Sequence, residues 1–183
     1  MSTDKVCSIF EPLVDGVGSN SPVNRGAYAT TAFDRLRILE RYRRIAIPGL
    51  SSNPFRPSHF AAIYLLSEGY DVVPVNPREK EVLGRKSYPS VSAVPDPVEV
   101  VDIFREPAAV PAIVEEAIAR HAKVIWMQLG VIHEGAAERA RQAGLEVVMD
   151  RCMKIEHARF FGGLNTIGMN TAVVTSKRRA SRR

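Results

Sequence analysis

Short, nearly unbroken apolar runs alternate along the chain with longer segments in which apolar residues recur at helical spacing. The runs predict strands, which are expected at residues 44–48, 71–75, 98–104, 123–129 and 146–150. The longer segments predict helices at residues 33–43, 59–68, 107–121 and 134–143. Because the strands show no polar alternation, both faces of their sheet must be covered. The pattern therefore predicts an α/β fold: a Rossmann-like, doubly wound, mainly parallel five-stranded sheet with helices on both faces.

This pattern occupies the middle of the chain. Residues 1–33, with their Gly, Ser, Asn and Pro, are expected to form an irregular N-terminal extension, and residues 34–165 to form the Rossmann-like domain. Residues 166–183 form a C-terminal extension whose basic tail we expect to be disordered. Inside the domain, the polar passage after the second strand predicts a short edge strand at residues 84–88.

The positive charge is concentrated at one end of the sequence. Residues 177–183 carry five positive and no negative charges, which accounts for the whole net charge of +5. The predicted domain is therefore not basic, and a nucleic-acid-binding function, one alternative, would depend on the tail. The arginines of residues 34–44 fit the solvent-exposed face of an amphipathic helix.

Membrane and metal functions find no support in the sequence. No apolar run approaches the roughly eighteen residues of a membrane span, and residues 1–10 lack the basic-then-apolar order of a signal peptide. We therefore expect a cytoplasmic protein with no membrane partner. Cys7 and Cys152 lie far apart and neither belongs to a CxxC pair, so the sequence predicts neither a disulfide framework nor a zinc site.

The loop after the first predicted strand has the composition of a phosphate-binding turn. Gly49 permits a tight turn and a close approach of backbone to ligand. Ser58 is a suitable N-cap for the next helix, whose free N–H groups attract anions. Ser51, Ser52 and Arg56 add hydrogen-bond donors at the same place. An ordinary strand-to-helix turn remains the alternative for this loop.

Ligands of such folds bind at the carboxyl ends of the strands, where the strand order reverses. The sequence contains neither the G-x-G-x-x-G of an NAD-binding loop nor the G-x-x-x-x-G-K-[ST] of a P-loop. The second strand instead runs into Asn76 and Pro77, and the cations Arg78 and Lys80 follow. These cations suit an adenosine that bears an extra phosphate. Coenzyme A (CoA), with its 3′-phosphate, and NADP, with its 2′-phosphate, both remain candidates.

Six segments together resemble a known family. Residues 47–58, 69–77, 84–90, 100–105, 124–130 and 148–157 resemble, in order and spacing, the successive blocks of the single-domain CoA-binding proteins. That family is similar to the CoA-binding domain of the succinyl-CoA synthetase alpha subunit. The resemblance extends over residues 44–157 and implies that the chain binds CoA or acyl-CoA at the carboxyl edge of its sheet.

The resemblance also implies where each part of CoA binds. The pyrophosphate is expected on Gly49, Ser51, Ser52 and Arg56. The adenosine is expected near Val75, Asn76, Pro77, Phe104 and Arg105. Independently of the resemblance, the charge of Arg78 places it close to the extra phosphate. The pantetheine arm is expected to pass Gln128, Gly130 and Cys152.

Several of these residues also have a purely structural interpretation. Phe104 is expected either to stack on adenine or to pack in the core, and Arg105 either to bind phosphate or to pair with Glu106. Cys152 is either a buried small residue or a reactive thiolate, since the cations Arg151 and Lys154 lie next to it in sequence.

The synthetases need a phosphorylated histidine on a further domain, for which this chain is too short, so we expect binding or sensing rather than catalysis. A protein partner or a homo-oligomer would then act on the bound state. An NADP-linked oxidoreductase or redox regulator is the alternative.

Overall fold

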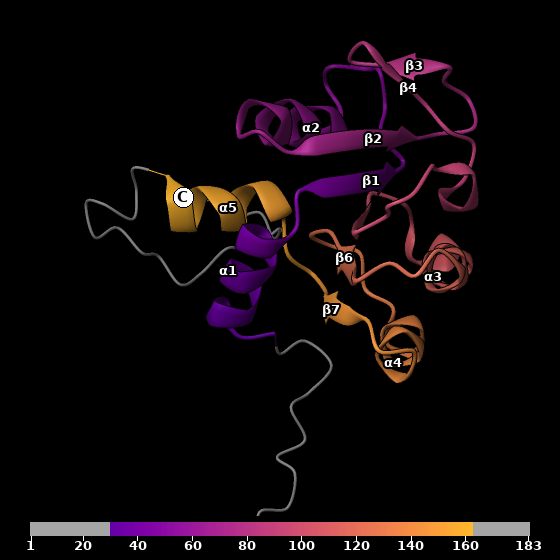
Figure 1. The fold of residues 1–183 in the computed structure, drawn as a ribbon. Helices are drawn as coiled ribbons and strands as arrows, with labels where there is room; N and C mark the ends of the chain where they lie inside the picture. The colour runs from indigo at the N-terminus through magenta and orange to yellow at the C-terminus, as the bar shows by residue number, and fades with distance from the viewer. Residues whose placement is uncertain (1–29, 163–183) are drawn as a thin grey trace, which may run out of the picture.

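The computed structural model describes residues 30–162, and these form a five-stranded sheet between two layers of helices (Figure 1). Most of the predicted N-terminal extension and the predicted basic tail lie outside the described residues. In the sheet the strands follow the order β2-β1-β5-β6-β7, and each pair of neighbours is parallel. The bounds are β1 (Arg44–Pro48), β2 (Asp71–Val75), β5 (Val100–Ile103), β6 (Val124–Met127) and β7 (Glu146–Val148). The predicted Rossmann-like fold is thus confirmed.

Helices cover both faces of this sheet. On one face lie α1 (Ala32–Arg41), α2 (Pro57–Ser67) and α5 (Met153–Phe161). On the other face lie α3 (Val110–Ala119) and α4 (Glu134–Gln142). Each layer encloses its own apolar cluster, with Trp126 in the first and Ile103 in the second. This double coverage explains why the strands are apolar along their whole length.

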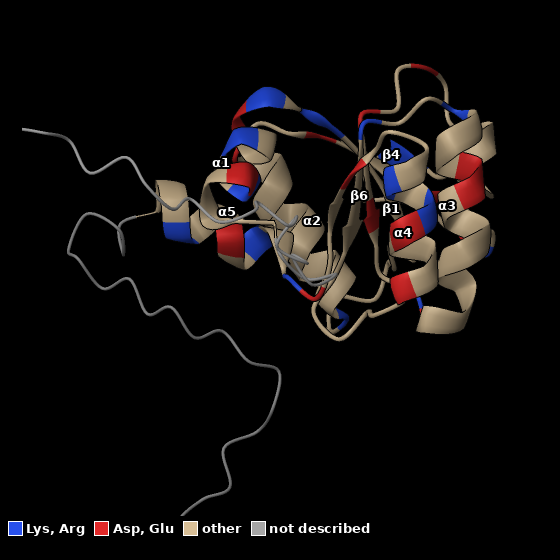
Figure 2. Ribbon diagram, turned by 90° about the horizontal axis from the view of Figure 1, so that it is seen from below, with Lys and Arg blue, Asp and Glu red and all other residues tan. Residues whose placement is uncertain are grey.

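Charged side chains join helices within each layer. Arg139 of α4 pairs with Glu115 of α3 at 2.8 Å on the surface, where acidic and basic segments alternate (Figure 2). In the other layer, Glu156 of α5 is buried and pairs with Arg35 of α1 at 2.7 Å. The arginines of the first helix are therefore not all exposed as predicted, because one of them neutralises a buried carboxylate.

The passage between β2 and β5 departs from the expected edge strand at residues 84–88. The strands β3 (Glu81–Val82) and β4 (Arg85–Lys86) form a separate antiparallel hairpin. After the hairpin, Tyr88 joins the main sheet through one parallel bridge to Val75. Two short 3₁₀ helices, η1 (Val91–Ala93) and η2 (Pro107–Ala109), complete the described elements.

The strand order locates the expected ligand site. The chain leaves β1 toward β2 on one side and later returns to β5 on the other side of β1. The loops after β1 and β5 therefore diverge, which leaves a crevice at the carboxyl edge between them. Among the described helices, none combines the length and the apolar character needed to cross a membrane.

Candidate ligand-binding site

The crevice is centred on Gly49, where the chain leaves β1. Gly49 has a φ of +89°, and its N–H donates to the Val75 carbonyl at 2.9 Å. A Cβ atom at this position would lie 2.6 Å from the carbonyl oxygen of Phe104 and 3.0 Å from Cδ of Arg105. Both the backbone conformation and the close approach of the β5 loop therefore require glycine.

The loop that follows Gly49 is held in place by its own polar groups. The Ser51 N–H donates to the Ser58 hydroxyl at 3.3 Å, and the Ser51 carbonyl lies 2.8 Å from Nδ1 of His59. His59 is buried in the first turn of α2. Asn53 donates its N–H to the Ser51 hydroxyl at 3.1 Å. These bonds turn the start of α2 toward the crevice.

Helix α2 begins one residue earlier than its predicted cap. Pro57 occupies the first turn and Arg56 stands at the cap position without a side-chain capping bond. Proline suits this position because its φ is already helical and it has no N–H to leave unpaired. The prediction of Ser58 as N-cap is therefore wrong, and Ser58 instead lies buried inside the first turn.

A large cavity, of about 740 Å³, lies beside this loop. Its walls come from the loops and helix starts that follow β1, β5, β6 and β7. The predicted site residues among them are Gly49, Ser51, Arg56, Phe104, Arg105, Gln128 and Cys152. Residues that the predicted site did not include are Phe55, Pro57, Ser58, Phe60, Ala61, Leu129, Val131, Lys154 and Ile155. Most of the predicted residues are thus brought together from four different loops.

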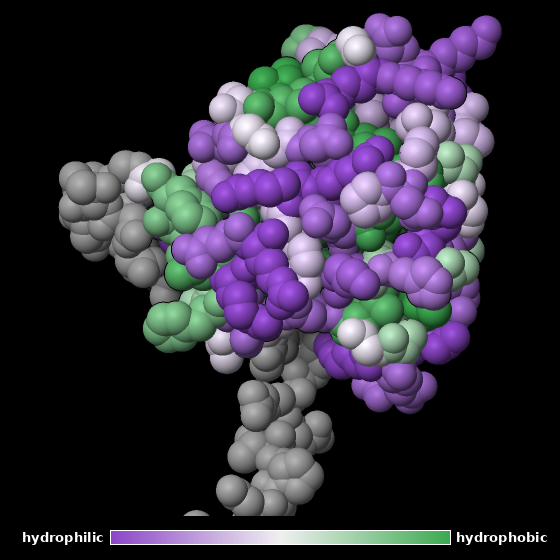
Figure 3. Space-filling view, in the orientation of Figure 1, coloured by the Kyte–Doolittle hydropathy of each residue, from purple (hydrophilic) through white to green (hydrophobic). Residues whose placement is uncertain are grey.

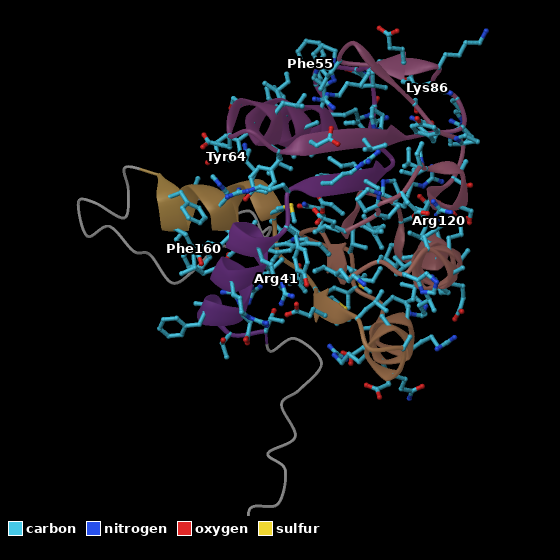
Figure 4. The ribbon with its side chains drawn as sticks, viewed as in Figure 1. Arg41, Phe55, Tyr64, Lys86, Arg120 and Phe160 are labelled. Atoms are coloured by element: carbon cyan, nitrogen blue, oxygen red, sulfur yellow. The ribbon has the colours of Figure 1, made fainter. Side chains whose placement is uncertain are left out.

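Two smaller hollows continue from this cavity. The second, of about 230 Å³, shares Gly49 and Arg105 with the first and is mostly apolar, with Val75 and Pro77 in its wall. The third, of about 340 Å³, shares Pro77 with the second and contains Lys80 and Lys86. The three hollows therefore form a series along the carboxyl edge of the sheet. In Figure 4 the labelled Lys86 lies at the upper end of the molecule, on the side of β2.

Three predicted residues are not in the walls of these hollows. The Ser52 hydroxyl donates to the carboxylate of Glu79 at 2.8 Å. Arg78 is exposed, and its N–H donates to the side-chain oxygen of Asn76 at 3.0 Å. The Gly130 N–H donates to the Asp150 carboxylate at 2.8 Å. Each residue therefore supports the shape of a loop next to the site.

The remaining predicted residues have two kinds of contact. Asn76 lines the third hollow, and its amide donates to the Leu50 carbonyl at 2.9 Å, which fastens the β1 loop to the end of β2. Phe104 packs against the core and lines the large cavity rather than the second hollow. Arg105 pairs with Glu106 at 3.1 Å while also lining two hollows.

A buried carboxyl group lies beneath the large cavity. Asp102 of β5 is fully buried, and its Oδ1 accepts a hydrogen bond from the amide of Gln128 at 2.7 Å. Its Oδ2 has no hydrogen-bond partner among the described residues. Burial raises the pKa of Asp102 to about 8, although the hydrogen bond from Gln128 acts in the opposite direction and lowers this pKa. The predicted site did not include Asp102, although an acid in an otherwise apolar strand was a visible signal.

Cys152 stands at the start of α5 and is partly buried. Burial raises the pKa of its thiol, and the nearby Asp102 raises it further, while backbone N–H groups and Lys154 lower it by less. Of the two interpretations of Cys152, this raised pKa favours the buried small residue over the thiolate, since loss of water outweighs the attraction of Lys154. His157, three residues after Lys154, lies 3.0 Å from the hydroxyl of Tyr64 of α2 and packs between these helices.

The described residues contain no group of three His, Cys, Asp or Glu side chains that could hold a metal ion. Together, the sheet order, the glycine turn and the series of hollows define a Rossmann-like protein with adjoining hollows at the carboxyl edge of its sheet. Within that class the chain belongs to the CoA-binding domain family, whose model matches residues 43–158.

Individual proteins are also similar to this chain. The chain is 38% identical over 121 residues to the uncharacterized protein YneT of Bacillus subtilis. The matched region covers 66% of this chain and 90% of YneT. It resembles the structure of a hypothetical protein from Pyrococcus horikoshii with 48% identity and a TM-score of 0.71, over 72% of this chain and 93% of the other. A dinucleotide-forming acetyl-coenzyme A synthetase of Ca. Korarchaeum cryptofilum, solved with phosphate and ADP, matches with 28% identity and a TM-score of 0.56. That match covers 63% of this chain and 27% of the synthetase.

Proposed function

We propose that the chain binds CoA or acyl-CoA along the carboxyl edge of its sheet and acts as a non-catalytic binding or sensing module. The observation that carries the proposal is the series of three hollows joined through Gly49, Arg105 and Pro77. CoA is a long ligand with a phosphate near one end, a flat base, a pyrophosphate and a thin arm. A series of adjoining hollows with different chemistry matches such a ligand better than one round pocket does.

Each hollow suits one part of CoA. The third hollow offers Lys80 and Lys86 to the 3′-phosphate, and the apolar second hollow suits adenine. At the border with the large cavity, Gly49 lets the pyrophosphate approach the backbone, and the positive end of α2 together with Arg56 attracts it. The large cavity then takes the pantetheine arm toward Cys152.

Binding without chemistry is supported by the state of the most nucleophilic group in the cavity. Burial keeps the pKa of the Cys152 thiol above its usual range, so the thiol stays protonated at neutral pH. A module of this kind would signal through the shape or the partner contacts of its loaded state.

Calorimetric titration of the full chain tests the proposal. CoA should bind, dephospho-CoA should bind more weakly, and NADPH should bind more weakly than either, because it has no arm to fill the large cavity. Lys86→Ala should reduce the preference for CoA over dephospho-CoA, whereas Arg78→Ala, next to the site but outside the hollows, should leave it unchanged. Absence of CoA binding, or tighter binding of NADPH, would refute the proposal.

A further inference from the structure

One wall of the large cavity is apolar and lies beside the residues expected at the CoA sulfur. Leu129 follows Gln128 in the β6 loop, and Ile155 lies one helical turn after Cys152 in α5. Phe60 and Ala61 of α2 face the same cavity. We call Phe60, Ala61, Leu129, Val131 and Ile155 the apolar wall. No part of CoA itself is a hydrocarbon chain that such a wall would select.

The wall continues into exposed aromatic residues at the mouth of the cavity. Phe60 is 55% exposed and Phe55, also in the cavity lining, is 87% exposed. Figure 3 shows hydrophobic residues in green near the top of the molecule, around α2, and in Figure 4 the labelled Phe55 lies above that helix. Grouped exposed aromatic side chains that border a cavity mark a site where an apolar partner binds.

We propose that the apolar wall holds the hydrocarbon chain of a short- or medium-chain acyl-CoA, so that the thioester rather than free CoA is the preferred ligand. The inference rests on the proposed function, because the CoA part of the ligand delivers the thioester to this cavity. Free CoA ends at its sulfur and leaves the wall in contact with water, whereas an attached acyl chain removes that apolar surface from water.

The polar group beside the wall suits a thioester. Gln128 lines the cavity, and one N–H of its amide is committed to Asp102 at 2.7 Å. This bond fixes the orientation of the amide, whose second N–H can donate to the carbonyl oxygen of a thioester. Free CoA has no carbonyl at that position.

The test compares CoA, acetyl-CoA and butyryl-CoA by calorimetry on the full chain. Each methylene that leaves water strengthens binding by about fourfold when fully buried. Since the mouth of the cavity is open, we expect butyryl-CoA to bind at least about tenfold more tightly than CoA, with acetyl-CoA in between. If CoA binds and the acyl forms bind no more tightly, the inference is wrong while the proposed function stands. If none of the three binds, the proposed function itself fails.

A pair of matched variants locates the effect. Phe60→Ser should remove most of the preference for butyryl-CoA and leave the affinity for CoA within about twofold, because CoA alone does not cover this wall. Phe33→Ser alters a phenylalanine of α1 that is 83% exposed and outside the cavity, and it should change neither affinity. Equal weakening of both ligands by Phe60→Ser would overturn the inference. So would a change of oligomeric state with an unaltered preference, since a second copy of the chain would then cover the wall.

Discussion

Replacing the buried Asp102 by asparagine should change how the stability of the domain depends on pH. The Asp102 carboxyl is fully buried, its Oδ1 accepts from Gln128 at 2.7 Å, and its Oδ2 is without a partner among the described residues. Asparagine has the same shape and keeps an acceptor for Gln128, but it cannot ionise. The substitution therefore removes the titration while retaining the packing and the hydrogen bond.

The size of the effect follows from proton linkage. Burial raises the pKa of Asp102 to about 8 in the folded state, whereas an aspartate in an unfolded chain titrates near about 3.9. Between these two values the folded state holds one proton that the unfolded state has released. The free energy of unfolding therefore falls as pH rises, by about 1.4 kcal/mol per pH unit, which amounts to roughly 3 kcal/mol from pH 5 to pH 7. The asparagine variant should lack this decline.

Urea unfolding at pH 5, 6 and 7 measures the difference between the two proteins. Subtracting the free energy of unfolding of the wild type from that of the variant cancels the contributions of other titrating groups. One of these groups is His157, because burial lowers its pKa. The difference should grow in favour of Asp102→Asn as pH rises, whereas Phe33→Ser, which changes an exposed residue of α1 and no ionisable group, should give a constant difference. A constant difference for Asp102→Asn would show that the buried carboxyl does not hold its proton, and the reasoning would be wrong.

Three further predictions concern the ligand. Arg56→Ala should weaken CoA binding by about 1–3 kcal/mol in calorimetry, the value of a hydrogen bond to a charged group, while Arg41→Ala on α1 should not. Gly49→Ala should lower the free energy of urea unfolding by about 1–3 kcal/mol and weaken binding, because φ is positive and the new Cβ would meet the Phe104 carbonyl; unchanged stability would contradict this. With oxidised CoA, the thiol of Cys152 should displace CoA thiolate and form a mixed disulfide, which intact-mass spectrometry detects. The reaction should be slow at pH 7 and faster above pH 9, because burial raises the pKa of the Cys152 thiol. An adduct that persists in Cys152→Ser would refute the assignment to Cys152.

The fold could be predicted from the sequence because the pattern of apolar residues indicates which segments form covered strands and which form helices. Runs such as Arg44–Pro48 and Asp71–Val75 carry apolar residues on both faces, which fits only a covered parallel sheet. Errors arose where local backbone chemistry decides the outcome. Pro57 rather than Ser58 starts α2. The polar passage after β2 forms a hairpin at Glu81–Val82 and Arg85–Lys86, and no apolar pattern in the sequence predicts it.

Positions in the site were predictable to the extent that they follow a strand. Gly49, Phe104 and Gln128 each come directly or closely after a strand end, so topology brings them to one edge. Lys86 could not be found this way, because only the folding back of the β3–β4 hairpin brings it to the third hollow. Nor could sequence spacing show that Asp102 meets Gln128, since the bond joins neighbouring strands 26 residues apart.

The order of the strands divides the proposed site into two independent halves. The third hollow, with Lys80 and Lys86, is built by the chain after β2, and the apolar wall by the starts of α2 and α5 and the loop after β6. Among residues 30–162, only Gly49 and Arg105 line both the large cavity and the second hollow. The losses of binding free energy that Lys86→Ala and Phe60→Ser cause for butyryl-CoA should therefore add, because the two side chains share no contact. The loss from either change should not add to that from a substitution at Gly49, where the two halves meet.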